Sequence, residues 1–199
     1  MKKIYLVVLV LLIGCSSDSV DSSDEAPVII ETGLKDLATS KGKFIGNLMR
    51  DGFFDNHDIY NGAIDNILKT EYNALVTGNK LKMVNLLRDR PEDPFNIKIS
   101  DLNTYNIDRF VNYANKHNMK KRGHVMIWYK QIPNWLDEES KTWTSQQIYD
   151  FTESYIRALS RYTNGKIDEW DVLNEAIVFN GYRSNTCLLY TSDAADEVV

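Results

Sequence analysis

The chain has 199 residues, enough for one domain with a sizeable hydrophobic core. A hydrophobic content of 43% and an aromatic content of 11% exclude an intrinsically disordered chain. The net charge of −5 argues against a nucleic-acid-binding protein, whose surface would be basic, so no nucleic-acid partner is expected.

The first fifteen residues have the pattern of a bacterial export signal. Lys2 and Lys3 precede the apolar run 4–13, which is too short to span a bilayer comfortably. The run ends in the letters LIGC at Cys15, which resemble a lipobox, where cleavage leaves a lipidated cysteine as the new N-terminus. A core helix with an incidental cysteine is the alternative. The pattern predicts a lipoprotein signal peptide over 1–15 and an exported protein whose lipid anchors it to the bacterial cell envelope, with the outer-membrane surface as one place of display.

Residues 16–33 are rich in Ser and Asp and lack hydrophobic periodicity, so they are interpreted as a flexible tether. Cys187 is the only other cysteine, and the sequence therefore offers no disulfide framework. The domain that follows must be stabilised by its core.

Four short apolar runs follow, and amphipathic segments separate them. Their nearly continuous apolar character is typical of strands covered on both faces, as in a parallel sheet. The runs are Lys43–Leu48, Tyr72–Thr77, Gly123–Trp128 and Glu169–Asn174.

Two helices are predicted between these runs. The first begins near Ser100-Asp101, and the second begins after Thr144, which forms a capping box with Gln147, and ends at Gly165. Their buried faces follow helical spacing: Ile107, Phe110, Val111 and Ala114 in the first, and Ile148, Phe151, Tyr155 and Leu159 in the second. Alternating strands and helices indicate an α/β fold, either a doubly wound sheet or half of a (β/α)8 barrel.

Polar residues that suit sugar chemistry follow the fourth run. Ligands of parallel α/β folds gather at the carboxyl ends of the strands, which is where Asn174 and Glu175 stand. A glycosidase needs a carboxylic acid to protonate the leaving oxygen, and an amide can bind the sugar 2-hydroxyl. The alternative for this pair alone is a solvated glutamate that begins a loop.

The third run carries a second set of such residues. His124 and Trp128 are four positions apart, so both are expected on one face of the sheet, where they could bind and stack a sugar ring. Gln131 follows, and Trp135 is expected to line the rim. Core packing would explain Trp128, but it explains His124 and Gln131 less well.

The segments "RGHVMIWYKQIPNW" and "WDVLNEA" together resemble glycoside hydrolase family 10, the (β/α)8 endo-β-1,4-xylanases, over about Leu34 to Ser184. The family pattern is R-G-H-x-x-x-W-H-x-Q-x-P-x-W, followed about forty residues later by W-D-V-x-N-E-A. The resemblance implies a (β/α)8 TIM barrel that is truncated after about strand 4, with residues 34–186 as the N-terminal half of the catalytic barrel.

The resemblance also implies roles for individual residues. Glu175 matches the proton donor and acceptor, and Asn174 matches the ligand of the 2-hydroxyl. Upstream, "YNALVTGNKLKM" resembles the family's F-N-x-x-T-x-E-N-x-M-K-W. The other residues that match sugar-binding positions are Asn79, Lys82, His124, Trp128 and Gln131, and Arg183 fits the family's arginine.

Three positions depart from the family pattern and leave the sugar preference open. Gly78 replaces a glutamate, which removes a hydrogen-bonding carboxylate. Met83 replaces a tryptophan, and Tyr129 replaces a histidine.

The second carboxylate of a retaining glycosidase is not found in this chain. In family 10 that nucleophile is a glutamate on the seventh strand, and the resemblance here stops soon after the fourth. Residues 187–199 contain "CLLYTSDAADE", which begins with letters that resemble the translation of a sequencing adapter, and they are expected to be an artefact. A genuine short C-terminal segment is the alternative. The chain itself is therefore expected to be inactive and prone to aggregate.

The expected function belongs to the parent protein, an endo-acting retaining endo-1,4-β-xylanase (EC 3.2.1.8) that cleaves xylan or xylo-oligosaccharides and is a monomer when complete. A non-catalytic glycan-binding cell-envelope lipoprotein and another (β/α)8 glycosidase remain the alternatives. No cofactor is implied, and no residues have metal-ligand spacing. His57 and His117 are expected to be surface or cap residues.

Overall fold

The computed structural model of the protein describes residues 33–178 and 181–182. Cys15 with the signal, residues 16–32 of the tether, Arg183 and residues 187–199 lie outside the described residues. None of the helices in the described part is long and apolar enough to cross a membrane.

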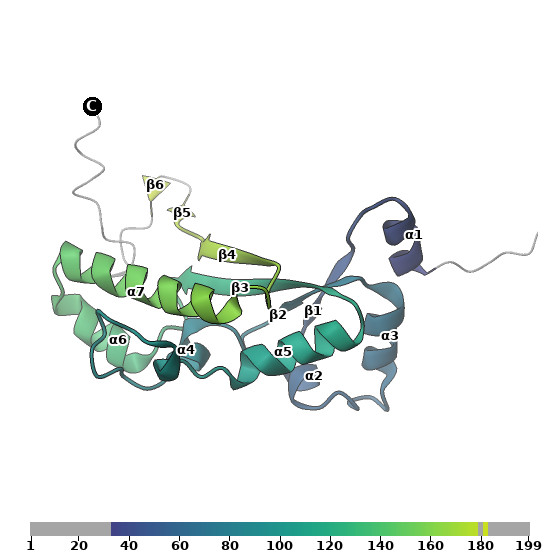
Figure 1. Ribbon diagram of the computed structural model, residues 1–199, viewed down its shortest axis with the longest axis horizontal. Helices are drawn as coiled ribbons and strands as arrows, with labels where there is room; N and C mark the ends of the chain where they lie inside the picture. The colour runs from purple at the N-terminus through teal and green to yellow at the C-terminus, as the bar shows by residue number, and fades with distance from the viewer. Residues whose placement is uncertain (1–32, 179–180, 183–199) are drawn as a thin grey trace, which may run out of the picture. The chain divides into compact units, whose positions relative to one another are not determined.

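Four parallel strands form the main sheet, in the order β1-β2-β3-β4 (Figure 1). Because every neighbouring pair is parallel, the carboxyl ends of all four strands meet at the same edge of the sheet. The strands are β1 (Gly46–Met49), β2 (Ala74–Thr77), β3 (Lys120–Trp128) and β4 (Glu169–Asn174). Two short strands, β5 (Ile177–Val178) and β6 (Gly181–Tyr182), pair antiparallel beyond β4.

The predicted strands are confirmed, with small shifts at their ends. The fourth agrees at both ends, whereas the third begins three residues earlier than predicted, at Lys120. The first two are shorter than predicted and begin at Gly46 and Ala74. The consecutive strands of the main sheet are parallel, which requires the crossover connections that the alternation predicted.

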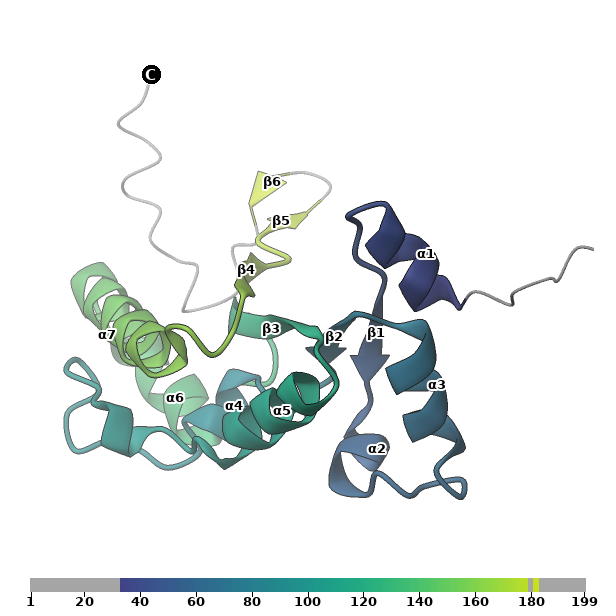
Figure 2. The ribbon, with the colours of Figure 1, turned by 45° about the vertical axis from the view of Figure 1, so that its right-hand side comes forward.

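The helices occupy the connections between the strands, and α3, α5 and α7 lie along the outer side of the row of strands (Figure 2). The α-helices are α1 (Leu34–Ser40), α2 (Asp51–Asp55), α3 (Ala63–Glu71), α4 (Met83–Leu86), α5 (Tyr105–Lys116), α6 (Asn134–Glu139) and α7 (Ser145–Thr163). Two short 3-10 helices are η1 (Ile99–Asp101) and η2 (Ser140–Thr142).

The helix predicted to begin near Ser100 starts later, at Tyr105. Asp101 accepts a hydrogen bond from the N–H of Lys98 (2.8 Å), and this local bond closes the turn of η1 instead. The N–H of Asn103 then donates to the carbonyl of Leu86 (2.7 Å), which ties the linker to α4. Short polar side chains often satisfy the backbone locally in this way and so delay a helix.

The capping box predicted for α7 is confirmed. Thr144 accepts from the N–H of Gln147, and the Gln147 side chain accepts from the N–H of Thr144 (2.9 Å). Gly165, just after the helix, has φ +72°, a conformation that favours glycine. The apolar positions predicted for both helices are buried: Ile107, Phe110, Val111, Ala114, Ile148, Phe151, Tyr155 and Leu159.

The expectation that the strands are covered on both faces holds for the second half of β3, where Val125, Met126 and Ile127 are all buried, but it is wrong for β2 and β4. The burial of β2 alternates along the strand, and on β4 Val172 is 49% and Leu173 50% exposed. Most of the core lies between the sheet and the helices, and β4 has little cover among the described residues. β4 is also an edge strand of the main sheet, which leaves one of its sides unpaired there.

Candidate active site

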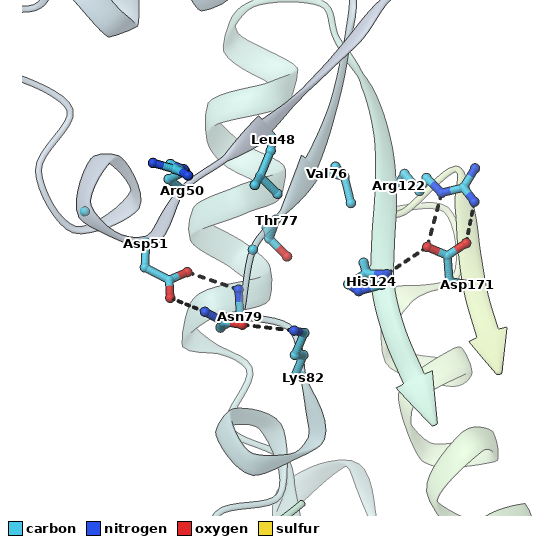
Figure 3. Close-up of a pocket in the computed structure, with 12 residues that line it drawn as sticks. Leu48, Arg50, Asp51, Val76, Thr77, Asn79, Lys82, Arg122, His124 and Asp171 are labelled. Atoms are coloured by element: carbon cyan, nitrogen blue, oxygen red, sulfur yellow. Dashed lines mark hydrogen bonds and ion pairs between the residues drawn. The ribbon is translucent and has the colours of Figure 1, made fainter. Parts of the chain in front are cut away.

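A cavity of about 750 Å³ opens where β1 and β2 end and borders β3 and β4. Figure 3 shows two groups of polar side chains that line it from opposite sides. Asp51, Asn79 and Lys82 follow β1 and β2, whereas Arg122, His124 and Asp171 project from β3 and β4. The ends of β1 and β2 and the neighbouring parts of β3 and β4 thus place residues far apart in sequence around one opening.

The first group is a hydrogen-bonded chain. Asp51, at the start of α2, accepts from the backbone N–H (3.1 Å) and the side-chain amide (2.8 Å) of Asn79. The carbonyl oxygen of the Asn79 side chain accepts from Nζ of Lys82 (2.9 Å). Lys82 is only 8% exposed, and burial lowers its pKa, while the negative charges of Asp51 and Glu175 oppose that shift. A buried ammonium and an oriented amide are therefore held at one side of the cavity.

Trp128 and Glu175 extend this chain at the ends of β3 and β4. Nζ of Lys82 lies 4.3 Å from the centre of the Trp128 ring, close enough for a cation–π contact. Nε1 of Trp128 donates to Oε2 of Glu175 (3.0 Å). Glu175 has φ +54°, an uncommon conformation for a residue with a side chain and one enriched at functional sites. Four residues singled out in the sequence, Asn79, Lys82, Trp128 and Glu175, are thus connected by direct contacts.

The second group centres on Asp171, which sequence reasoning missed. Its carboxylate bonds to Nδ1 of His124 (2.9 Å) and pairs with the guanidinium of Arg122. Asp171 is the register partner of His124 in the β3–β4 pair. The signal was present in the sequence: aligning the predicted ends of the two strands, Trp128 with Asn174, brings position 171 close to position 124.

The prediction that His124 and Trp128 share one face rested on strict alternation along β3. The β3–β4 register shifts between His124 and Ile127, so alternation does not run unbroken across this segment. Both residues nevertheless reach the surroundings of Lys82, since His124 lines the same cavity and Trp128 contacts the ammonium. A shared face for the two side chains therefore does not follow from alternation in this segment.

The pKa of Asp171 predicts a dependence of stability on pH. Burial raises this pKa, but hydrogen bonds from Arg122 and His124 and their charges outweigh burial and hold it below its usual range. The carboxylate therefore contributes stability above its unfolded pKa of about 4, and this contribution is lost as pH falls through the lower folded pKa.

We expect Asp171→Asn to lower the free energy of unfolding near neutral pH and to flatten its decline below about pH 4. Urea unfolding of the whole protein encoded by the source locus, at a series of pH values, measures both effects. Asp137→Asn, which removes an exposed carboxylate paired with Lys141, serves as the matched control. If the free energy of unfolding of Asp171→Asn fell with decreasing pH as steeply as that of the wild type, Asp171 would not be a source of the pH dependence.

The remaining predicted residues make contacts of other kinds. Gln131 is exposed after β3, and its backbone carbonyl accepts from the N–H of Val84 (2.9 Å). Trp135 does not line the rim as expected, because its ring packs against Phe151 and its Nε1 donates to the carbonyl of Leu87 (3.3 Å). Asn174 is half-buried and pairs in register with Trp128.

Two of the three positions that depart from the family pattern, Met83 and Tyr129, differ in their surroundings. Met83 is 2% exposed and belongs to the hydrophobic core, whereas Tyr129 packs edge-on to Trp128 with ring centres 5.7 Å apart. Tyr129 therefore adjoins the network through Trp128, whereas Met83, next to Lys82 in sequence, packs in the core. Within the described residues no group of three or more His, Cys, Asp or Glu could hold a metal ion.

The two histidines set aside in the sequence are packed against aromatic rings. His117 is the C-cap of α5, as expected, and its ring centre lies 4.7 Å from that of Tyr113. His57 is not an isolated surface residue, because its ring stacks on Phe53 at 4.9 Å. The ring of His57 also contacts Tyr113 of α5, and burial lowers the pKa of both imidazoles.

Comparison with known proteins defines the class to which this α/β fold and its carboxylate-bearing groove belong. The family model for glycosyl hydrolase family 10 matches residues 33–193. The chain is 28% identical over 181 residues to endo-1,4-beta-xylanase B of Thermotoga neapolitana, a match that covers 89% of this chain and 45% of that protein. It is 37% identical over 84 residues to endo-1,4-beta-xylanase A of Xylanibacter ruminicola, covering 41% of this chain and 23% of that protein.

A solved structure shows the same fold. Xylanase 10B from Thermotoga petrophila in complex with xylobiose superposes with a TM-score of 0.68 and 23% identity, over 82% of this chain and 47% of that one. The chain belongs to glycosyl hydrolase family 10. Its parallel sheet of four strands with crossover helices corresponds to part of the family's (β/α)8 TIM barrel, so the predicted fold is confirmed. The chain spans less than half the length of these relatives.

Proposed function

We propose that the whole protein is an endo-acting retaining xylanase and that Glu175 is its general acid/base. The observation that carries the proposal is the position of Glu175 directly after β4 in a family 10 chain, held by Nε1 of Trp128. The names of the relatives, endo-1,4-beta-xylanases, support the substrate class. The neighbouring Lys82, Asn79 and His124 supply the donors and acceptors that a neutral sugar requires.

The chemistry follows from a pair of carboxyl groups. Glu175 donates its proton to the glycosidic oxygen as the bond between that oxygen and the anomeric carbon breaks. A second carboxylate, a glutamate on the seventh strand by family resemblance, attacks the anomeric carbon and forms a covalent glycosyl ester. Glu175 then takes a proton from water. The water oxygen bonds to the anomeric carbon and displaces the carboxylate, which releases a sugar with its original configuration.

Residues that line the cavity or follow β3 and β4 beside it would act on binding. In this proposal Asn174 holds the 2-hydroxyl, whose hydrogen bond strengthens as positive charge develops on the ring. His124, fixed by Asp171, presents one imidazole nitrogen with a set orientation. The ring of Trp128 offers an apolar face beside the ammonium of Lys82. These side chains position the sugar, while Glu175 moves the proton.

The test begins with a long DNA read of the source locus across codon 186 and onward. We expect four further βα units with a glutamate at the end of strand seven, and we expect the encoded protein to cleave internal bonds of xylan. Proton NMR during hydrolysis of a xylo-oligosaccharide should show the β-anomer first, as retention requires.

A non-catalytic glycan-binding lipoprotein is the second candidate, because the altered Gly78 and Tyr129 adjoin the groove. It predicts binding of xylo-oligosaccharides without turnover and a residue other than glutamate at the end of strand seven. That pair of results would overturn the xylanase proposal.

A further inference from the structure

We propose that Asp51 is a specificity-determining residue of the cavity at the ends of β1 and β2. Its carboxylate fills the space left by the missing side chain at Gly78, orients Asn79, and accepts a hydroxyl of the bound sugar. The inference rests on the proposed function for the identity of the ligand, but its geometric basis is independent of it.

The first observation is spatial. A Cβ atom added to Gly78 would lie 3.2 Å from Oδ1 of Asp51, and the next nearest atom, the carbonyl oxygen of Met49, would lie 3.8 Å away. The Asp51 carboxylate therefore occupies the volume that a side chain at residue 78 would enter. Asp51 and Gly78 both line the cavity, so the space in question belongs to the site. A side chain at residue 78 would therefore press on the Asp51 carboxylate and require it to shift.

The second observation concerns the orientation of the Asn79 amide. A carboxylate can only accept hydrogen bonds and an ammonium can only donate them. Oδ2 of Asp51 therefore selects the NH2 end of the Asn79 side chain, and Nζ of Lys82 selects its carbonyl oxygen. Oδ1 of Asp51 meanwhile fixes the Asn79 backbone through its N–H. Without a carboxylate at residue 51, the NH2 group of Asn79 loses this acceptor, and only Lys82 orients the amide.

The third observation is the remaining capacity of the carboxylate. Each carboxylate oxygen can accept about two hydrogen bonds, and each oxygen of Asp51 accepts one from Asn79. Asp51 is half-buried and borders the cavity, so further acceptor positions lie within reach of a ligand. Lys82 lies on the other side of Asn79 with donors beyond the one it gives to the amide. Acceptors and donors on either side of an amide match adjacent hydroxyls of a pyranose ring.

A purely structural role for Asp51 makes a different prediction. Asp51 stands in the first turn of α2, where a negative charge favours the helix. In that case only a carboxylate at residue 51 would serve. If the Asp51 carboxylate instead acts on the sugar in the cavity, a carboxylate at residue 78 should replace it, because both positions line the same space.

The experiment therefore moves the carboxylate between the two positions in the whole protein encoded by the source locus. Asp51→Ala and Gly78→Glu are made singly and together, and xylotriose is the probe. Turnover gives kcat and KM, and titration calorimetry of each variant in a Glu175→Gln background, where turnover is slowed, gives Kd. Asp55→Ala, at the other end of α2 and ion-paired with Lys80, is the matched control.

We expect Asp51→Ala to raise KM and Kd about 10- to 100-fold, the range for a lost hydrogen bond to a charged group, with a smaller change in kcat. Gly78→Glu alone should also weaken binding, because it forces two carboxylates into one space. The KM and Kd of the double variant should return to within about threefold of the wild-type values, because a carboxylate is again present in the same space. Asp51→Asn, which sets a donor against the donors of Asn79, covers the possibility that Asp51→Ala does not fold.

The outcomes separate this inference from the proposed function. A double variant as weak as Asp51→Ala, or Asp51 variants that bind normally, would overturn the role of Asp51 while xylan cleavage by the wild type still stands. A wild type that binds xylotriose without cleaving it would overturn the xylanase proposal, and the Kd values would still decide the role of Asp51. A wild type that neither binds nor cleaves would overturn both.

Discussion

Glu175→Gln in the whole protein is expected to lower kcat on xylan by about 10²- to 10⁴-fold, the usual contribution of a general acid/base. The substitution is nearly isosteric, and the glutamine oxygen can still accept from Nε1 of Trp128. Only the ability to give and take a proton is removed, so KM should change far less than kcat. Initial rates of reducing-end release, measured with purified variant and wild type, determine both constants.

The leaving group provides the sharper part of this experiment. An aryl xyloside whose phenol is strongly acidic departs without protonation, so formation of the glycosyl ester should be nearly as fast in Glu175→Gln as in the wild type. A burst of phenol followed by slow turnover would show that the second step still needs the base. Glu153→Gln on α7, where the glutamate pairs with Arg157, is the control and should leave the rates unchanged. Equal loss on acidic and ordinary leaving groups would contradict the role of Glu175 as acid.

Gly123→Ala is expected to lower the free energy of unfolding by about 3 kcal/mol, the upper part of the range for overpacking a core. A Cβ atom at this position would lie 2.3–2.5 Å from three ring atoms of Trp170. Gly123 and Trp170 are register partners in the β3–β4 pair, so neither can withdraw without breaking the pairing. Urea denaturation of the whole protein, followed by tryptophan fluorescence, measures the loss.

Gly52→Ala is the matched control for this change. Gly52 lies in α2, and the nearest atom to an added Cβ is Cδ1 of Ile59 at 3.8 Å, an ordinary contact distance. Alanine should therefore be neutral or stabilise by up to about 1 kcal/mol, since it is the better helix former. A Gly123→Ala protein as stable as the wild type would show that the Trp170 ring does not rest on the backbone of residue 123.

The positions of the elements were accessible from local patterns. The fourth strand, Glu169–Asn174, and the capping box at Thr144 agree with the structure, because hydrophobic runs and caps act within a few residues. The later start of α5 escaped prediction, because the linker forms the turn of η1 and bonds to the backbone of α4. A contact to a distant carbonyl leaves no mark on the local pattern.

The sequence by itself determined the family, the order of the strands and helices, and the candidate residues at the strand ends, since motifs such as "WDVLNEA" are contiguous. Only the tertiary structure decided which side chains meet. The bond of Asp171 to His124 depends on a register that a bulge interrupts, and the seat of Asp51 beside Gly78 depends on two strands that end side by side. These pairs are separated by 47 and 27 residues, as their numbers show. The packing of sheet and helices, rather than any local preference, brings them into contact.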